Sequence, residues 1–298
     1  MLTKQNKNKI HIGSKSVDVV LAAFMLLMSV IFLYPFLNVV ATSLSSNRMI
    51  TTGQVTFFPK ELIFDGYKLL FKEENIFGAY WNTLVIAFGS AFFSLVLTSL
   101  LAYVMMVPEF VLRKPLSIFL LITMFFSGGT VPTYLLIQNL GLYDTWWSLI
   151  LPNAVSAYNV FVYRSFYQGI SSEIREAAKI DGASELQILT RIYVPLSKAL
   201  YATFGLFSVV GVWNSYYEAL LYIKNPDKQP IQMLLRKIVF TSGTANMSDA
   251  QQMISNGQMN QLNVQYACVI ATIGPILLMY PFVQKYFAQG MQVGAVKG

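Results

Sequence analysis

Cysteine, histidine and charged residues are all scarce in this sequence of 298 residues. It has one cysteine, Cys268, and one histidine, His11, which excludes a disulfide framework and argues against a metal site. Charged residues make up 12% of the chain, whereas soluble domains have about 25%. No phosphate-binding loop, nucleophile elbow or catalytic triad is present, since the sequence G-S-K-S at 13–16 lacks the upstream glycine of a P-loop. We therefore expect no catalytic residues, no metal and no cofactor in this chain.

Long apolar runs are abundant instead, because 55% of the residues are hydrophobic. A helix needs about 20 apolar residues to cross a bilayer, and several runs reach that length. The first run is well beyond the roughly 7–15 apolar residues of a signal peptide, so we predict that it is an uncleaved span. The fold class predicted is all-α, a polytopic membrane protein with six spans. These are expected at 17–44, 80–106, 116–137, 147–166, 195–223 and 266–287, with a break in the third at 127–132.

The distribution of charge predicts the orientation of these spans. The net charge is +7, and the excess of Lys and Arg falls in the segments that six spans place on the inner side. This predicts a cytoplasmic tail at 1–16, a six-helix membrane domain at 17–287 and a second cytoplasmic tail at 288–298. The longest outer loop is expected at 224–265. With the excess accounted for by topology, no basic surface is left for nucleic acid.

The segment 172–195 is polar, although strongly apolar spans flank it on both sides. We predict two short helices here, the first with Ser172 as N-cap and the second with a capping box of Ser184 and Gln187. Gly182 is expected at positive φ in the turn between them. The second helix is expected to have one apolar face, made of Leu186, Leu189 and Tyr193.

The same segment resembles the EAA loop of ABC-importer permeases, with Val194 standing where that family usually has Leu. The residues that carry the resemblance are Glu176, Ala177, Ala178, Asp181, Gly182, Ala183, Ile192 and Pro195. Weaker matches to sugar-importer permeases follow in order along the chain, among them Asn82-Thr83-Leu84, Phe126-Ser127-Gly128-Gly129 and Trp213-Asn214.

The resemblance implies a type I (MetI-like) permease fold in a bacterial plasma membrane, with the hairpin as the helix pair that couples to an ATPase. The partners it implies are a second, homologous permease that completes a heterodimer, two ABC ATPase subunits and an extracytoplasmic solute-binding protein. ATP and Mg²⁺ would bind to the ATPase. The substrate implied is a sugar or oligosaccharide.

A polar and aromatic cluster in the predicted fifth span is the candidate substrate pathway. Aromatic rings stack on the C–H faces of sugars, while amides and carboxylates accept and donate hydrogen bonds to their hydroxyls. The aromatic residues of this cluster equally suit a belt at the membrane interface. The cluster consists of Trp213, Asn214, Tyr216, Tyr217 and Glu218.

Two other classes of function remain open at this point. A secondary carrier or facilitator would work without an ATPase, but such carriers use ionisable groups inside their spans, and the central parts of the second, third and sixth spans have none. A membrane sensor or scaffold would use the hairpin only to recruit a cytoplasmic partner. We favour the ABC permease.

Overall fold

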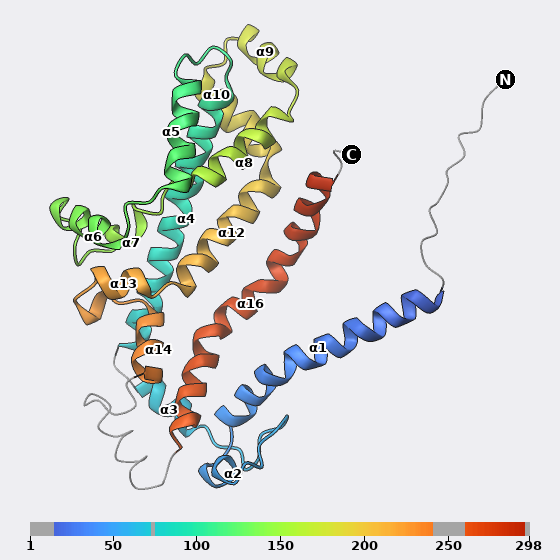
Figure 1. Cartoon of the computed structure of the whole chain (residues 1–298), viewed down its shortest axis with the longest axis vertical. Helices are drawn as coiled ribbons and strands as arrows, with labels where there is room; N and C mark the ends of the chain where they lie inside the picture. The colour runs from blue at the N-terminus through green and yellow to red at the C-terminus, as the bar shows by residue number, and fades with distance from the viewer. Residues whose placement is uncertain (1–14, 73–74, 241–259, 296–298) are drawn as a thin grey trace. The chain divides into compact units, whose positions relative to one another are not determined.

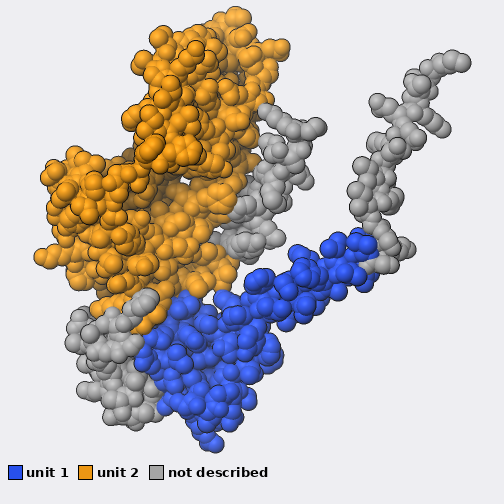
Figure 2. All heavy atoms as spheres, in the orientation of Figure 1, with its two compact units in different colours: residues 1–70, 243–270 blue, residues 71–242, 271–298 orange. Residues whose placement is uncertain are grey.

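The computed structural model describes residues 15–72, 75–240 and 260–295, and all regular elements in these ranges are helices (Figure 1). The one β-type contact among them is an isolated bridge between Ser45 and Leu62. The chain divides into two compact units, shown in blue and orange in Figure 2. Unit 1 contains residues 1–70 and 243–270, and unit 2 contains residues 71–242 and 271–298.

Unit 1 is built from α1 (Lys15–Ser43), α2 (Asn47–Thr51), most of α3 (Asp65–Lys72) and the start of α16 (Gln261–Ala295). Asn263 on α16 is fully buried and its amide donates to the backbone oxygens of Thr42, Ser43 and Ser45 at 2.9–3.2 Å. These bonds satisfy carbonyls at the end of α1 that have no partner within the helix. The apolar side chains of α1 are largely exposed, as expected of a helix whose surroundings are lipid.

Unit 2 holds the remaining helices. In chain order they are α4 (Ile76–Met106), α5 (Arg113–Phe125), α6 (Thr130–Asn139), α7 (Trp147–Ile150), α8 (Ala157–Gln168), α9 (Ser172–Ile180), α10 (Glu185–Ile188), a π-helical turn (Leu189–Tyr193), α11 (Val194–Leu196), α12 (Lys198–Asn214), α13 (Tyr217–Tyr222), a 3₁₀ turn (Pro226–Lys228), α14 (Ile231–Phe240) and the rest of α16.

Helix α4 is the central element of unit 2 and packs against both α8 and α12. Its buried side is made mostly of small residues, which let neighbouring backbones approach closely where lipid gives no hydrophobic driving force. Ala87 and Ala91, for example, pack against Val209 of α12. Gly205 on α12 faces Leu95 of α4, and an added Cβ there would lie 3.2 Å from the Leu95 side chain. The composition of α4 thus determines how close α12 lies.

The predicted break in the third span is present. Helices α5 and α6 are bent by 117° at residues 126–129, and Gly129 there has φ +85°, a conformation that favours glycine. The predicted first and second spans correspond to α1 and α4, and the last to part of α16.

The count of six spans is not reproduced. Among the described residues, three helices are long and apolar enough to cross a membrane, Val17–Ser43, Ile76–Met106 and Gln261–Leu278. The count rises to five if each of two bent helix pairs forms one span. The predicted fourth span is divided into α7 and α8 around Pro152, which has no N–H for a helical hydrogen bond.

Two other boundaries differ from the sequence prediction. The fifth span was expected to continue to Ile223, but α12 ends at Asn214 and the chain turns at Ser215 into α13, bending away from a straight helix. The outer segment 224–265 was expected to be a loop without a hydrophobic stretch, yet it contains α14, where Ile231 and Met233 are buried. The Asn- and Gln-rich part of that loop at 246–259 lies outside the described residues.

Asp144 connects the turn after α6 with the segment after α13. Its Oδ1 accepts hydrogen bonds from the backbone N–H groups of Lys224 and Asn225 at 3.0 and 2.9 Å, and Lys228 Nζ lies 3.4 Å from Oδ2. The N–H groups of Asn225 and then Lys224 lower the pKa of the Asp144 carboxyl, and the charge of Lys228 adds to this. The backbone N–H of Asp144, at φ +57°, also donates to Tyr222 O at 2.8 Å.

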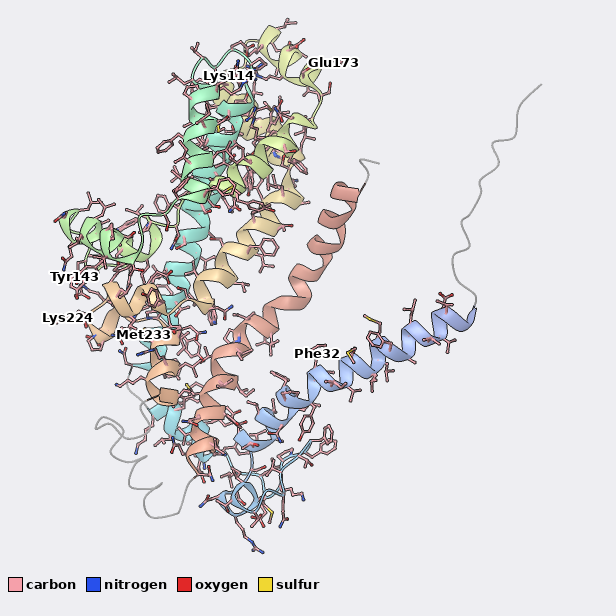
Figure 3. All side chains as sticks on the ribbon, viewed as in Figure 1. Phe32, Lys114, Tyr143, Glu173, Lys224 and Met233 are labelled. Carbon is pink, nitrogen blue, oxygen red and sulfur yellow. The ribbon has the colours of Figure 1, made fainter. Side chains whose placement is uncertain are left out.

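These contacts lie at one end of unit 2, and the hairpin of α9 and α10 lies at the other. Figure 3 shows Glu173 and Lys114 near one end of the unit and Tyr143, Lys224 and Met233 toward the opposite end. Asn82 on α4 adds to the contacts at the Asp144 end, because its amide donates hydrogen bonds to the backbone oxygens of Asp227 and Gln229.

Candidate functional site

The hairpin of α9 and α10 folds largely as its sequence predicts. Gly182 has φ +79°. Its N–H donates to Lys179 O and the N–H of Ala183 donates to Ala178 O, which is the Schellman arrangement that ends a helix on a left-handed glycine. The capping box of Ser184 and Gln187 is complete.

Two details of the hairpin differ from the prediction. The N-cap of α9 is Ser171, whose Oγ accepts from the Glu173 N–H, and Ser172 is the first helical residue. Leu186 is 62% exposed, while Leu189 and Tyr193 are buried. The π-helical turn at Leu189–Tyr193 was not expected, and its wider winding replaces the simple helical spacing on which the predicted apolar face depended.

The motif residues of the hairpin divide between two faces. Glu176, Ala177, Asp181, Gly182 and Pro195 are exposed. The others are half-buried and pack against the adjoining core, namely Ala178, Ala183 and Ile192.

Apolar side chains lie beside the exposed motif residues. Ile180 at the end of α9 is 87% exposed and Ile174 is 41% exposed. Exposed apolar side chains grouped on a polar segment are typical of a protein-binding surface.

Arg175 is directed inward from α9 and is only 7% exposed. Its Nη2 lies 2.7 Å from Glu185 Oε1 on α10 and 3.4 Å from Glu109 Oε2 in the turn after α4. Lys179 Nζ, one helical turn on, lies 2.9 Å from Glu185 Oε1. Tyr103 on α4 donates its hydroxyl to Glu185 Oε2 at 2.5 Å. We call Arg175, Lys179, Glu185, Glu109 and Tyr103 the Arg175 cluster.

The electrostatics of the cluster favour the charged forms. Partial burial alone would raise the pKa of the Glu185 carboxyl, but the hydrogen bonds from Arg175, Tyr103 and Lys179 outweigh it and lower the pKa from 4.5 to about 2. Burial likewise lowers the pKa of Arg175, and its hydrogen bonds to Glu185, Tyr103 and Glu109 more than compensate, so that the pKa is raised. Arg175 and Glu185 are therefore both charged at neutral pH, and Tyr103 is a neutral donor beside them.

A group of tyrosines continues from the cluster into the helices of unit 2. The ring of Tyr103 meets that of Tyr193 edge to face at 5.2 Å, and Tyr193 meets Tyr167 of α8 at 5.4 Å. The Tyr167 hydroxyl is hydrogen bonded to that of Tyr201 on α12 at 2.7 Å and to Ser99 Oγ on α4 at 2.9 Å. Contacts of this kind join α4, α8 and α12 beneath the hairpin.

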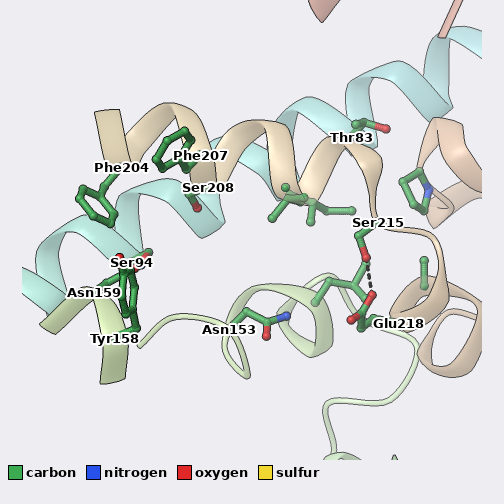
Figure 4. A pocket seen from close by; sticks show the side chains of 16 residues that line it. Thr83, Ser94, Asn153, Tyr158, Asn159, Phe204, Phe207, Ser208, Ser215 and Glu218 are labelled. Atoms are coloured by element: carbon green, nitrogen blue, oxygen red, sulfur yellow. Dashed lines mark hydrogen bonds between the residues drawn. The ribbon is translucent and has the colours of Figure 1, made fainter. Parts of the chain in front are cut away.

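A cavity of about 470 Å³ lies between α4, α8 and α12 and the short helices α7 and α13 (Figure 4). This is within the roughly 300–1,000 Å³ of small-molecule sites. Among the described residues, its lining has no basic side chain and one carboxylate, Glu218, which accepts a hydrogen bond from the Ser215 hydroxyl. The labelled lining residues are Thr83, Ser94, Asn153, Tyr158, Asn159, Phe204, Phe207, Ser208, Ser215 and Glu218.

The structure separates the five residues predicted to form the substrate pathway. Glu218 lines the cavity, whereas Trp213 is 3% exposed and donates its indole N–H to Thr272 O on α16. Asn214 is exposed and bonds to Val210 O of its own helix. The guanidinium carbon of Arg236 lies over the ring of Tyr216, 5.8 Å from the ring centroid. Tyr217 is about half exposed.

Sequence reasoning missed two sets of residues. Tyr158-Asn159 has the same combination of aromatic ring and amide as Trp213-Asn214, and its position inside a predicted span was a usable signal. The Arg175 cluster had a weaker signal in the sequence. Arg175 and Lys179 are four residues apart and so lie on one helical face, which indicated a face that needs carboxylates. Nothing local indicated that one of them is Glu109.

The comparison with known families identifies the chain. Residues 74–293, which hold both the hairpin and the cavity, match the family described as binding-protein-dependent transport system inner membrane component. The chain belongs to this family. It is thus a permease component of an ABC importer with a MetI-like, helical membrane fold, and it is a transport subunit rather than an enzyme. The family assignment gives no support to a secondary carrier or facilitator.

Individual permeases of sugar importers are similar over nearly the whole chain. The polygalacturonan/rhamnogalacturonan transport system permease protein YtcP of Bacillus subtilis (strain 168) is 36% identical over 94% of this chain and 98% of its own. The arabinooligosaccharides transport system permease protein AraQ of the same organism is 26% identical, covering 94% and 96%.

A solved structure is similar as well. It is a chain of a bacterial ABC transporter involved in the import of the acidic polysaccharide alginate, with a TM-score of 0.86 and 28% identity. The match covers 96% of this chain and all of that one. This structural match is therefore longer than the family match over residues 74–293.

Proposed function

We propose that this permease carries a sugar or oligosaccharide and that its cavity is part of the translocation pathway. The observation that supports this is the lining, which combines unpaired polar groups with aromatic rings. Within the described residues, the side chains of Asn153, Asn159 and Ser208 have no hydrogen-bond partner in the chain, so they are available to sugar hydroxyls. Phe204 and Phe207 supply rings on which the C–H face of a sugar packs. The similar permeases of sugar importers agree with this substrate class.

The hairpin is proposed as the surface that binds the ATPase. Its exposed motif residues, with Ile180 and Ile174 beside them, form a contact face at the end of unit 2 opposite Lys224. This end would be cytoplasmic, as would both termini, in the plasma membrane of a bacterium. Two ATPase subunits, a second homologous permease and an extracytoplasmic solute-binding protein would complete the importer. ATP and Mg²⁺ would bind on the ATPase subunits.

The proposal is tested by reconstituting the complete importer in liposomes and measuring ATP-dependent sugar uptake. Phe207→Ala should lower uptake about tenfold, because one lost stacking contact removes the burial of much of a Phe side chain. Asn159→Leu should have a similar effect by removing a hydrogen-bonding group of nearly the same size. The ATPase should still co-purify with both variants, since neither residue touches the hairpin.

The matched control is Lys114→Ala, an exposed change on α5 away from the cavity, which should transport normally. Uptake that continues without the ATPase would contradict the assignment to an ABC importer. Normal uptake by both cavity variants would instead remove the cavity from the pathway.

A further inference from the structure

The buried charge of Arg175 is unusual in a helix whose other residues lie at or near the surface. Taking a guanidinium out of water is costly unless anionic partners compensate for it. Here two carboxylates do so, and they belong to different parts of the chain, Glu185 on α10 and Glu109 in the turn after α4. The side chain thus joins three segments, α9, α10 and the turn after α4.

The contact between Arg175 and Glu185 also fixes an orientation. Nη2 and Nε of the guanidinium face the two oxygens of Glu185, at 2.7 and 3.4 Å. A planar two-point contact of this kind restrains rotation as well as distance, which a single point charge does not do. Gly182, between α9 and α10, has a left-handed conformation with no atom within 4 Å of an added Cβ, so side-chain packing at the turn itself does not fix the angle between the two helices.

We propose that Arg175 is a positioning residue that makes the hairpin and α4 move as one body when the ATPase moves the hairpin. This rests on the proposed binding of the ATPase at α9. Arg175 holds Glu185, Glu185 accepts the hydroxyl of Tyr103, and Tyr103 belongs to α4 itself. From there the edge-to-face contacts of Tyr193 and Tyr167 reach α8, and the hydroxyl bond between Tyr167 and Tyr201 reaches α12; both helices line the cavity.

The arrangement explains why the contact is made with charges rather than with apolar side chains. An apolar contact at the end of a hairpin can slide, because packing has little directional preference. The Arg175 side chain is only 8% exposed, so loss of its carboxylate partners would leave an uncompensated buried charge, which opposes separation of the contact. The four charged groups, Arg175, Lys179, Glu185 and Glu109, also balance each other, which leaves no net charge at the joint.

The test measures the number of ATP molecules hydrolysed per sugar transported, using the reconstituted importer and its own binding protein. Arg175→Met should leave the ATPase bound and hydrolysing, while uptake per ATP falls at least about fivefold, the lower range of coupling between sites. Glu185→Gln should act in the same direction. Tyr103→Phe keeps the ring against Tyr193 and removes only the bond to Glu185, so it should show a smaller loss without disturbing folding.

The additivity of the two losses in uptake per ATP shows whether Arg175 and Glu185 act through one contact or stabilise the protein independently. In the double variant Arg175→Met with Glu185→Gln, uptake per ATP should fall no further than in Arg175→Met alone, because both changes break one contact. Arg175→Lys keeps the charge but not the two-point contact and should restore uptake only in part. Lys114→Met is the control for loss of a cation elsewhere at this end of the unit and should couple normally.

Two results would overturn the proposal. One is uptake per ATP at the wild-type level in Arg175→Met and Tyr103→Phe, and the other is a fully additive loss in the double variant. Failure of the proposed ATPase contact at α9 would look different, since Gly182→Val, which strains the turn beside α9, would then leave ATPase binding unchanged. If Arg175→Met does not assemble, Tyr103→Phe and Glu109→Gln, which alters a 64% exposed side chain, still give the decisive measurement.

Discussion

The indole Nε1 of Trp213 lies 3.1 Å from the backbone oxygen of Thr272 and donates a hydrogen bond to it, which joins α12 to α16 within unit 2. The ring centroids of Trp213 and Tyr80 on α4 are 6.4 Å apart, and the Tyr80 hydroxyl donates a hydrogen bond to Ala271 O at 2.7 Å. Three helices therefore meet at this tryptophan. The contact gives Trp213 a structural role, and Trp213 is not among the residues that line the cavity.

Trp213→Ala should consequently act on folding rather than on substrate recognition. Removal of a buried aromatic side chain costs about 3–5 kcal/mol of stability, so we expect less assembled importer in the membrane. Thermal unfolding of the purified complex and its yield would measure this. Whatever importer does assemble should keep its apparent affinity for sugar. A complex of normal stability with a selectively weakened affinity would restore Trp213 to the pathway.

Gly182 gives a second prediction, in which the side chain that replaces it decides the result. The backbone there has φ +79° and open space around the site of a Cβ, so a substitution is limited by conformation and not by collision. Gly182→Val should strain the turn by about 1–3 kcal/mol, misorient α9 and reduce ATPase binding. Gly182→Asn should be much milder, because Asn accepts this conformation more readily. Co-purification of the ATPase compares the two, and equal binding by both variants would contradict the argument.

The hairpin was predictable because its signals are local. Gly182 and the capping box depend on residues a few positions apart, and both have the conformation that the sequence predicts. The Arg175 cluster was not predictable in the same way. Its second carboxylate, Glu109, is 66 residues away from Arg175 in sequence and approaches only because α4 and α9 end on the same side of unit 2.

The ionisation of Glu185 gives a prediction for pH. Its pKa is lowered from 4.5 to about 2, so the stabilisation from its ion pairs is complete above about pH 4.5 and is lost as the pH falls from there toward 2. We expect wild type to exceed Glu185→Gln in melting temperature by a constant amount from pH 8 to about 5, and the difference to narrow below. Melting curves of the two purified complexes at matched pH would show it. A difference that changes between pH 8 and 6 would mean that another group titrates in the cluster.

The orientation of unit 2 can be tested with single cysteines. In a Cys268→Ala background, Lys224→Cys should react with a membrane-impermeant maleimide in intact cells. Glu173→Cys and Lys114→Cys should react only after the cells are permeabilised, since both lie near the hairpin end (Figure 3). Labelling of all three positions from the outside would exclude a cytoplasmic hairpin and with it the proposed contact to the ATPase.

The spans show where hydrophobicity alone fails. The apolar content of 195–223 and 147–166 is high enough for single helices, but the turn at Ser215 and the interruption at Pro152 divide them. Apolar runs report which residues avoid water and do not report where the helix axis turns. The cavity arises from these interruptions, since Asn153, Ser215 and Glu218 reach it from the turns and short helices beside them. This is why the residues predicted from one continuous helix do not share one surface, since Glu218 lines the cavity and Trp213 and Asn214 do not.

The bonds of Asp144 have a mechanical consequence for the end of unit 2 far from the hairpin. Asp144 ties the turn after α6 to the N–H groups of Lys224 and Asn225, and Asn82 ties α4 to the same segment. A force applied at α9 therefore acts on unit 2 at the end opposite these bonds, where α4, the turn after α6 and the segment after α13 are held together. If the helices tilt about this fixed region, the distance between them changes most near the hairpin and least near Asp144.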